Sequence, residues 1–458
     1  MRIIRMVQGW FAPSQTSLVS PFLDSMLVGG VSIIAYIILQ VAVSKGADIY
    51  TWSIALYYAA FLINFPHFAA SYLLMYGDAR QSLGSLRTGR RFMIKMWWAG
   101  LAVPVLLIGY FLYAKSQGSI MLMGYLVNAL FFFVGWHYIK QIFGCVVVLS
   151  AAKKVYYSRL ERTAILLPLY LLWALSFFSA NLSGAHNMFY QVPYTAWTLP
   201  PLWLKLSEQV LFVASNLLLA MFIVKYIISR VTPPVSAVIA LVSIYLWYIP
   251  ALSHPYFFYI IPLFHSLQYL LFVFAARRNQ AIREERDTPV TRNTASRYNL
   301  WGGAFLLLLP AVLIGLSLKE SATLTLDRYI MTLSSGFTTV GWVTGALLCL
   351  SVGMLTLLYH RQARGRWGIV TFFGSAYFLG ALFFALIPIW LDLWVARGTA
   401  PAWLSYPTTV FGTSLYFFFF TVFLNIHHYF IDNVIWKKDN PYVAENLMYR
   451  PVVAESKL

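Results

Sequence analysis

The chain has 458 residues, of which 60% are hydrophobic and only 10% are charged, and its mean hydropathy is +0.70. A soluble protein would have to bury nearly all of its surface to accommodate this composition, whereas a bilayer accepts apolar helices because their backbone groups are paired internally. The net charge of +18 comes from Lys and Arg residues in short segments between apolar runs, not from one basic patch, so nucleic acid is not an expected partner. The sequence therefore predicts an all-α, polytopic integral membrane helix bundle.

Apolar runs of about 20 residues, the length of a membrane-spanning helix, recur from one end of the chain to the other. We place about twelve transmembrane helices, at 22–44, 51–76, 93–115, 119–150, 163–181, 207–229, 233–250, 254–276, 299–317, 335–359, 367–395 and 406–436. If the N-terminus is cytoplasmic, 26 of the 33 Lys and Arg residues fall in or beside the inner segments. This asymmetry obeys the positive-inside rule. We therefore predict that both termini are cytoplasmic and that the protein is a multi-pass protein of the inner (cytoplasmic) membrane of the cell.

The longest polar stretch divides the predicted helices into two groups. We interpret 1–276 as a membrane domain of eight helices and 277–298 as a cytoplasmic linker. A second membrane domain of four helices follows at 299–436, and 437–458 is predicted to be a cytoplasmic tail.

Histidines are the main polar anomaly inside the predicted spans. Ionisable groups at membrane depth are costly unless they are paired, and they commonly mark functional sites. Five of the eight histidines are in this position: His67, His137, His265 and the adjacent pair His427 and His428. In this topology their helices all run from outside to inside, and each motif lies 9 to 16 residues before the next basic residue of a loop. At 1.5 Å per residue the spread is about 10 Å, so we expect these side chains to meet in one layer.

Other polar residues accompany the histidines at helical spacing. On the last span Asp432 shares one stripe with His428, four residues apart. Four amides are candidates for orienting the histidine rings: Asn64, Gln141, Gln268 and Asn425. Three tyrosines adjacent to these motifs are candidate catalytic residues: Tyr138, Tyr269 and Tyr429.

Neutral imidazoles and a carboxylate in a dry interior are the ligand set expected of non-haem iron, Fe²⁺, ahead of zinc, copper or manganese. Coordination would also satisfy polar groups that lipid leaves unpaired. The predicted ligands are His67, His137, His265, one or both of His427 and His428, and Asp432. The alternative interpretation is that each histidine is an ordinary buried residue with its own hydrogen-bond partners.

The order of these motifs resembles that of the Brp/Blh family of microbial membrane β-carotene 15,15'-dioxygenases. The matching elements are Pro66-His67, His137, Phe264-His265-Ser266 and the five-residue spacing from His427 to Asp432. The resemblance implies an all-helical iron enzyme that splits β-carotene into retinal, and it favours His427 as a ligand.

This chain also departs from the family pattern. The acidic residues that follow the first two histidines of the family are absent, and Ser71 and Gln141 stand nearby instead. The helical stripe that contains Asp432 favours His428 over His427, so the choice between the two histidines stays open at this point.

The sequence therefore predicts a membrane oxygenase or oxidase that acts on an apolar, membrane-dissolved substrate, either a carotenoid or another lipid. O₂ is the expected second substrate, and an electron-donor protein is a further candidate partner. The alternative is a secondary transporter with twelve helices and a buried His/Asp site for protons or a metal. The chain has no convincing internal repeat, which argues against a transporter. A haem protein like the haem-copper oxidases fits less well, because the adjacent histidine pair comes last and no His-x-His element accompanies it.

Overall fold

The fold is known from a computed structural model, which describes residues 16–77, 90–181, 186–190, 192–195, 200–253, 257, 260–287, 365–437 and 440–448. Within these residues the secondary structure is helical apart from one two-stranded antiparallel hairpin. Six helices are long and apolar enough to cross a membrane: Pro21–Ser44, Arg90–Ser116, Ile120–Ala152, Arg159–Ser179, Pro201–Ser229 and Gly368–Ala396. The chain is therefore a helical membrane protein.

The described elements of the first half follow the predicted spans closely. They are α2 (Pro21–Ser25), η1 (Met26–Gly30), α3 (Val31–Ser44), α4 (Ile49–Tyr72), η2 (Leu73–Gly77), α6 (Arg90–Trp97), η3 (Trp98–Ala102), α7 (Val103–Ser116), α8 (Ile120–Ala152) and α9 (Arg159–Asn181). Here η denotes a π-helical turn.

The hairpin and the second half complete the described chain. The elements are β1 (His186–Phe189), β2 (Val192–Thr195), α10 (Pro201–Ser229), α11 (Val235–Ser253), α12 (Ile261–Asp287), α16 (Gly365–Ala381), η5 (Leu382–Leu386), α17 (Ile387–Ala396), α18 (Thr408–Phe411), α19 (Leu415–Ile435), α20 (Pro441–Val443) and η6 (Ala444–Met448). The predicted spans 299–317 and 335–359 lie outside the described residues.

Helix α12 differs most from its prediction. It begins at Ile261 instead of 254 and continues to Asp287, so the first part of the predicted linker at 277–298 is helical. This part is rich in Arg and Glu, which favour helix, and the Gln280 amide donates to Glu284 Oε1 at 2.9 Å, one turn later.

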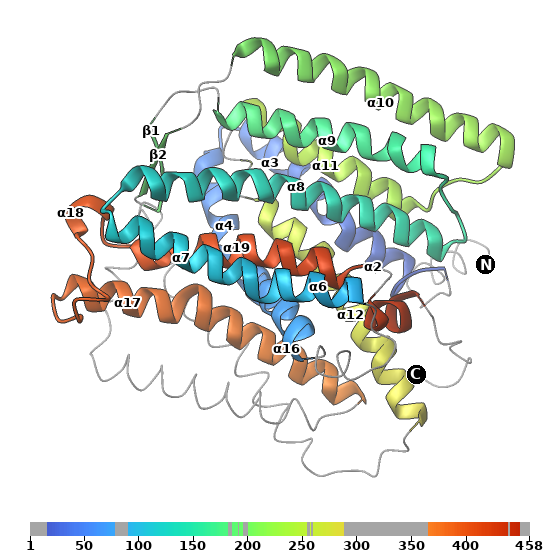
Figure 1. Ribbon diagram of the computed structural model, residues 1–458. Coiled ribbons are helices and arrows are strands. Elements are labelled where there is room, and N and C mark those ends of the chain that lie inside the picture. Colours follow the sequence, from blue (N-terminus) through green and yellow to red (C-terminus); the bar gives the residue numbers. More distant parts are fainter. Residues whose placement is uncertain are drawn as a thin grey trace.

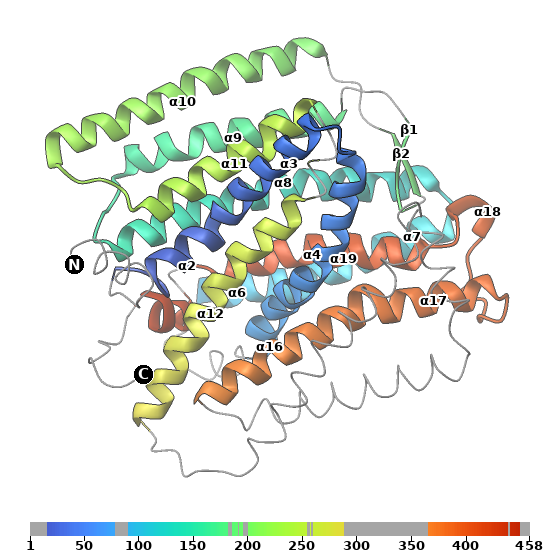
Figure 2. The same ribbon diagram turned by 180° about the vertical axis from the view of Figure 1, so that it is seen from behind.

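The long helices pack in layers across the bundle. Figure 1 shows α10, α9 and α8 in succession on one side of α19, with α16 and α17 on its other side. Seen from behind, α4 and α12 cross the bundle between these layers (Figure 2). Helix α4 packs against both α12 and α16, and α19 packs against both α8 and α4. The four helices that contain the buried histidines are therefore neighbours.

Backbone carbonyls in two π-helical turns accept hydrogen bonds from side chains of other elements. A π turn shifts the hydrogen bonds of a helix and often occurs at functional positions. In η3 the carbonyl of Ala99 lies 3.0 Å from His427 Nε2, and the carbonyl of Gly100 accepts from the Tyr76 hydroxyl at 2.7 Å. In η1 the carbonyl of Val28 accepts from the Gln268 amide. The interruptions thus connect neighbouring helices around the histidines.

Helices α4 and α16 approach each other closely because Gly380 has no side chain. A Cβ atom added there would overlap the carbonyl oxygen of Phe65, which is backbone and cannot move aside cheaply. Pro66 follows in α4 and lacks the N–H that a helix interior normally uses, so the helix is also weakened at this point. His67 comes next in the sequence, and its position therefore depends on the contact at Gly380.

Candidate metal centre

Four histidines from four helices form one buried cluster. They are His67 on α4, His137 on α8, His265 on α12 and His428 on α19, and we call them the four-histidine cluster. One ring nitrogen from each lies within 4.8 Å of the others, and none of the four residues is more than 5% exposed. The prediction that the histidine motifs meet in one layer is confirmed for these four.

Several polar atoms of the site are buried without a hydrogen-bond partner in the described chain. They are His67 Nε2, His265 Nδ1, His428 Nε2 and Asp432 Oδ2. Leaving a buried polar group unsatisfied costs about 1–3 kcal/mol, so several together require a physical cause. A metal ion bound by His67 Nε2, His428 Nε2 and Asp432 Oδ2 would supply one for three of these atoms, whereas His265 faces the cluster through Nε2, 3.2 Å from His137 Nε2, and a metal there would not pair its Nδ1.

The spacing of the donor atoms suits such an ion. His137 Nε2 lies 3.2 Å from His265 Nε2, and Asp432 Oδ2 lies 3.2 Å from His428 Nε2 and 3.7 Å from His137 Nε2. Two ligand atoms that each bind one metal at about 2.1 Å are separated by about 3.0 Å at a right angle, about 3.4 Å at a tetrahedral angle and about 4.2 Å when they are opposite each other. The residues present therefore fit a metal ion held by imidazoles and one carboxylate.

Hydrogen bonds fix the ring orientation of His67. Its Nδ1 lies 2.6 Å from Ser266 Oγ, and the Ser266 hydroxyl donates in turn to Asn64 Oδ1 at 2.7 Å. Since the hydroxyl proton is directed to Asn64, Ser266 Oγ accepts from the N–H of His67 Nδ1. His67 Nε2 then carries the lone pair that faces the cluster, as is typical of metal-bound histidines.

A second network does the same for His428. The Ser71 hydroxyl donates to Asp432 Oδ1 at 2.8 Å, and the oxygen of Ser71 lies 2.9 Å from His428 Nδ1 and 2.5 Å from the Tyr269 hydroxyl. Tyr269 also donates to Asp432 Oδ1 at 3.1 Å. Ser71 thus accepts from the N–H of His428 Nδ1 and leaves His428 Nε2 facing the cluster, beside Asp432.

The adjacent histidine His427 lies outside the cluster. Its Nε2 is 3.0 Å from the Ala99 carbonyl, and its Nδ1 is 2.9 Å from the Tyr72 hydroxyl. A carbonyl can only accept, so Nε2 carries the proton and donates to Ala99. The helical stripe therefore identified the histidine that faces the cluster, whereas the resemblance pointed to its neighbour.

The predicted amides occupy supporting positions of different kinds. Asn64 acts on His67 through Ser266, as expected. Gln141 donates to the backbone carbonyl of His265 at 2.9 Å and to Gln268 Oε1 at 3.1 Å, so these two amides join α8, α12 and η1 instead of orienting an imidazole. Asn425 Oδ1 accepts from the Tyr429 hydroxyl at 3.0 Å, so it orients a tyrosine and not a histidine.

Each of the three candidate catalytic tyrosines packs against a cluster histidine. Tyr429 stacks on His137, and Tyr138 and Tyr269 pack at a tilt against His265 and His67, each pair with ring centroids 4.4 Å apart. All three rings are buried. They form an aromatic wall around the site, and among them the Tyr269 hydroxyl also reaches Asp432.

Two serines of the site were not among the predicted site residues. Ser71 lies one turn after His67, and Ser266 is adjacent to His265 in the sequence. Helical spacing was the signal available for Ser71. The partners of Ser266 are His67 and Asn64 on another helix, which only the packing of α12 against α4 brings within reach.

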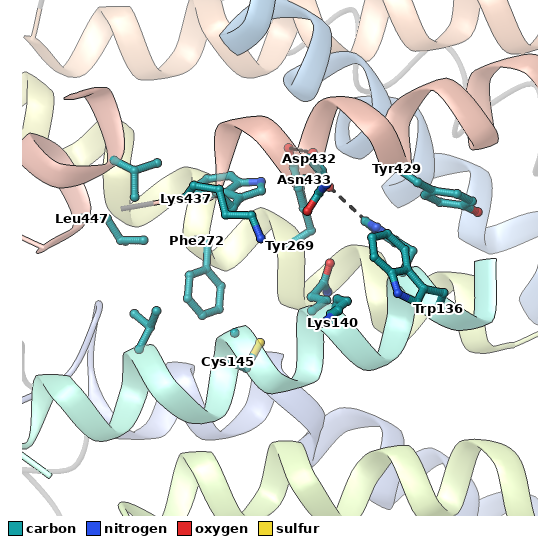
Figure 3. A pocket seen from close by; sticks show the side chains of 16 residues that line it. Trp136, Lys140, Cys145, Tyr269, Phe272, Tyr429, Asp432, Asn433, Lys437 and Leu447 are labelled. Atoms are coloured by element: carbon teal, nitrogen blue, oxygen red, sulfur yellow. Dashed lines mark hydrogen bonds and ion pairs between the residues drawn. The ribbon is translucent and has the colours of Figure 1, made fainter. Parts of the chain in front are cut away.

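A cavity reaches the cluster along the boundary between α8 and α19. It is lined at one end by His137 and Asp432 and at the other by Lys437 and by Leu447 of η6. Figure 3 shows its labelled lining residues and the contact between His137 and Asp432 at the cluster end. The site is therefore accessible from the part of the bundle where α19 ends.

The fold and the site together define a helical membrane protein with a buried cluster of four histidines that can hold a metal ion. Comparison of the chain with protein families, with curated proteins and with solved structures gives no match.

Proposed function

We propose that the four-histidine cluster and Asp432 bind a redox-active metal ion, with Fe²⁺ the first candidate, and that the protein is a membrane oxygenase. The substrate would be an apolar molecule dissolved in the bilayer, a carotenoid or another lipid. The observation that carries the proposal is that ring nitrogens of four buried histidines lie within 4.8 Å of one another beside a carboxylate, and that His67 Nε2, His428 Nε2 and Asp432 Oδ2 have no hydrogen-bond partner in the described chain. Neutral imidazoles with a carboxylate are the donor set of non-haem iron proteins. The order of the histidine motifs, which resembles that of the Brp/Blh family, supports the same chemistry.

A bound iron ion would supply the centre at which O₂ is activated. In the carotenoid form of the proposal, one carbon–carbon double bond is broken and both atoms of O₂ become carbonyl oxygens of the two products, so no reductant is consumed. Ser71 and Tyr269 hold Asp432 through its Oδ1 and leave Oδ2 for the site. The rings of Tyr138 and Tyr429 exclude water from the space beside His265 and His137.

The proposal includes a topology of twelve spans in the inner membrane with both termini cytoplasmic. Its support is the distribution of Lys and Arg in the sequence and the alternating direction of the described helices, in which α8, α10 and α19 run opposite to α9 (Figure 1). The metal-binding layer would then lie in the inner half of the bilayer.

The experiment is elemental analysis of the purified protein beside a His67→Ala/His265→Ala double variant, followed by O₂ uptake with β-carotene in detergent micelles. We expect about one iron per chain in the wild type, loss of iron in the variant, and O₂ uptake only by the metal-loaded wild type. If the wild type holds no stoichiometric metal, or the double variant holds as much, the oxygenase proposal fails and a transporter with a buried His/Asp site becomes the leading alternative. A haem absorption band would identify a haem protein instead.

A further inference from the structure

One side of the mouth of the α8–α19 cavity is formed by a short segment outside the long helices. This segment comprises residues 440–448, with α20 and η6, and we call it the C-terminal strap. Its residues Val443 and Leu447 line the cavity, and they are only 2% and 3% exposed. Both belong to one apolar core with Cys145 of α8 and Phe272 of α12. The strap therefore covers part of the cavity with apolar side chains.

The first residue of the strap is anchored to the end of α19. The Asn440 side-chain amide donates to the carbonyl of Ile435 at 2.8 Å, and Asn440 Oδ1 accepts from the backbone N–H of Tyr442 at 3.0 Å. Asn440 is buried. These two hydrogen bonds cap the first turn of the strap and fix its start relative to α19.

The far end of the strap is held by polar side chains of α12. Arg283 donates to Asn446 Oδ1 at 2.5 Å, and it also pairs with Glu445 Oε2 at 3.4 Å. The Asn279 amide donates to the backbone carbonyl of Asn446 at 2.8 Å. We call these three contacts the latch. The side chains of the ion pair are 24% and 55% exposed, and a pair exposed in this way is weak because water competes for it.

The strap is thus built so that it can move without the helices. Its latch lies on α12, outside the cavity, whereas the side chains that it holds in place, Val443 and Leu447, face the cavity. Segments with few anchors open locally at a much lower free energy than that of global unfolding. Release of the latch would withdraw both side chains from the mouth and would alter no residue of the four-histidine cluster.

We propose that the C-terminal strap is the movable wall of the cavity mouth, and that release of its latch opens the passage by which an apolar substrate reaches the four-histidine cluster. The inference rests on the proposed function, because it concerns access to the same site. The arrangement carries it, since a buried site needs a passage from the membrane, the cavity reaches the cluster, and the strap stands at the mouth on a partly exposed latch.

Cys145 provides a reporter of the strap that does not touch the cluster. It lies on α8 eight residues after His137, lines the cavity and is only 1% exposed. Its thiol is free, and Figure 3 labels it together with Leu447 of the strap. The other cysteine, Cys349, lies outside the described residues and is replaced by Ser in all the proteins compared.

The experiment measures the rate at which N-cyclohexylmaleimide, an apolar reagent that dissolves in the bilayer, modifies Cys145 in Cys349→Ser protein in nanodiscs. Metal content and unfolding temperature are determined on the same samples. We expect Arg283→Ala, which removes two latch contacts, to raise the rate by about fivefold or more. Leu447→Ala should also raise it, because it widens the mouth while the latch stays intact. Arg159→Ala is the control and should leave the rate unchanged, because Arg159 is exposed at the start of α9 and does not line the cavity.

Equal rates in the parent protein, Arg283→Ala and Leu447→Ala would overturn the proposal. Acceleration that appears only together with a lowered unfolding temperature would overturn it as well, because the bundle itself would then have loosened. The metal measurement keeps the two proposals apart. Protein that is modified as expected but holds no metal would contradict the oxygenase and leave the movable strap standing. Protein that holds metal but is insensitive to both strap variants would contradict the strap alone.

Discussion

At the scale of single residues, the adjacent histidines of α19 show how one residue step changes a role. Consecutive helical residues differ in direction by about 100°, so the two rings cannot face the same neighbours. His428 faces the cluster beside Asp432, while His427 donates to the carbonyl that the π turn η3 presents. The sequence could predict that His428 faces Asp432, because these two residues lie four positions apart in one helix. It could not predict the partner of the other, because a π turn in a different span supplies it.

This difference predicts opposite outcomes for two otherwise similar substitutions. His428→Ala should abolish stoichiometric metal binding, because it removes a donor atom from the centre of the site. His427→Ala should keep the metal, because its ring nitrogens bond to Ala99 and Tyr72. Elemental analysis of both purified variants measures the effect. Loss of metal in His427→Ala at unchanged thermal stability would show that the wrong histidine has been assigned.

Ser71 is a positioning residue whose removal tests the hydrogen-bond network. It joins His428, Asp432 and Tyr269 without itself contributing a proposed ligand atom. Ser71→Ala should lower metal affinity by about 10–100-fold, the usual effect of removing the partner of a metal ligand. Metal competition titration measures it, and Ser71→Thr should restore much of the affinity because the hydroxyl is retained.

The control for this substitution is Ser375→Ala on α16. Ser375 is also fully buried, and its hydroxyl has no hydrogen-bond partner in the described chain. Its removal should leave metal affinity unchanged. Equal affinities for the Ser71→Ala and wild-type proteins would exclude the positioning role.

At the scale of elements, the sequence predicted span positions better than the contacts between spans. Hydropathy located the described helices to within a few residues at most ends, because a run of about 20 apolar residues is stable in few environments except the bilayer. It gave no sign of the π turns, or of the close approach of α16 to α4 at Gly380. Both depend on which helices become neighbours, and an apolar run has the same hydropathy whichever neighbour it meets.

The approach of α16 to α4 predicts a substitution that acts on the site from outside it. Gly380→Ala places a methyl group against the Phe65 carbonyl and should destabilise the fold by about 1–3 kcal/mol, the usual cost of overpacking. Because His67 lies two residues after Phe65, metal affinity should fall as well. Thermal unfolding in detergent and metal titration measure the two effects.

Gly144→Ala is the matched comparison and should act in the opposite direction. Its added methyl group meets open space, and replacing Gly by Ala inside a helix contributes about 1 kcal/mol of helix propensity. An unfolding temperature for Gly380→Ala at or above that of Gly144→Ala would mean that α4 and α16 are not in close contact.

At the scale of the whole molecule, the four-histidine cluster follows from depth and direction together. The predicted topology placed the histidine motifs at similar depth on helices that run the same way, and four helices meeting at that depth bring four rings together. The sequence could not specify which faces meet, so the roles of Gln141, Gln268 and Asn425 differ from those predicted. Composition determines the environment of this chain, whereas packing determines its polar contacts.

The number of spans is open to a direct test in the segment between α12 and α16. Helix α12 ends and α16 begins at the same end of the bundle (Figures 1 and 2), which agrees with the even number of crossings that the sequence predicts between them. The sequence predicts two, at 299–317 and 335–359.

Alkaline phosphatase, which is active only outside the inner membrane, should therefore be active when fused after residue 325 and inactive when fused after residue 154. A green fluorescent protein fused at the same points should give the reverse pattern. If the phosphatase fused after residue 325 is inactive and the green fluorescent protein fused there is fluorescent, the segment between α12 and α16 lies on the cytoplasmic side. The number of spans would then be ten.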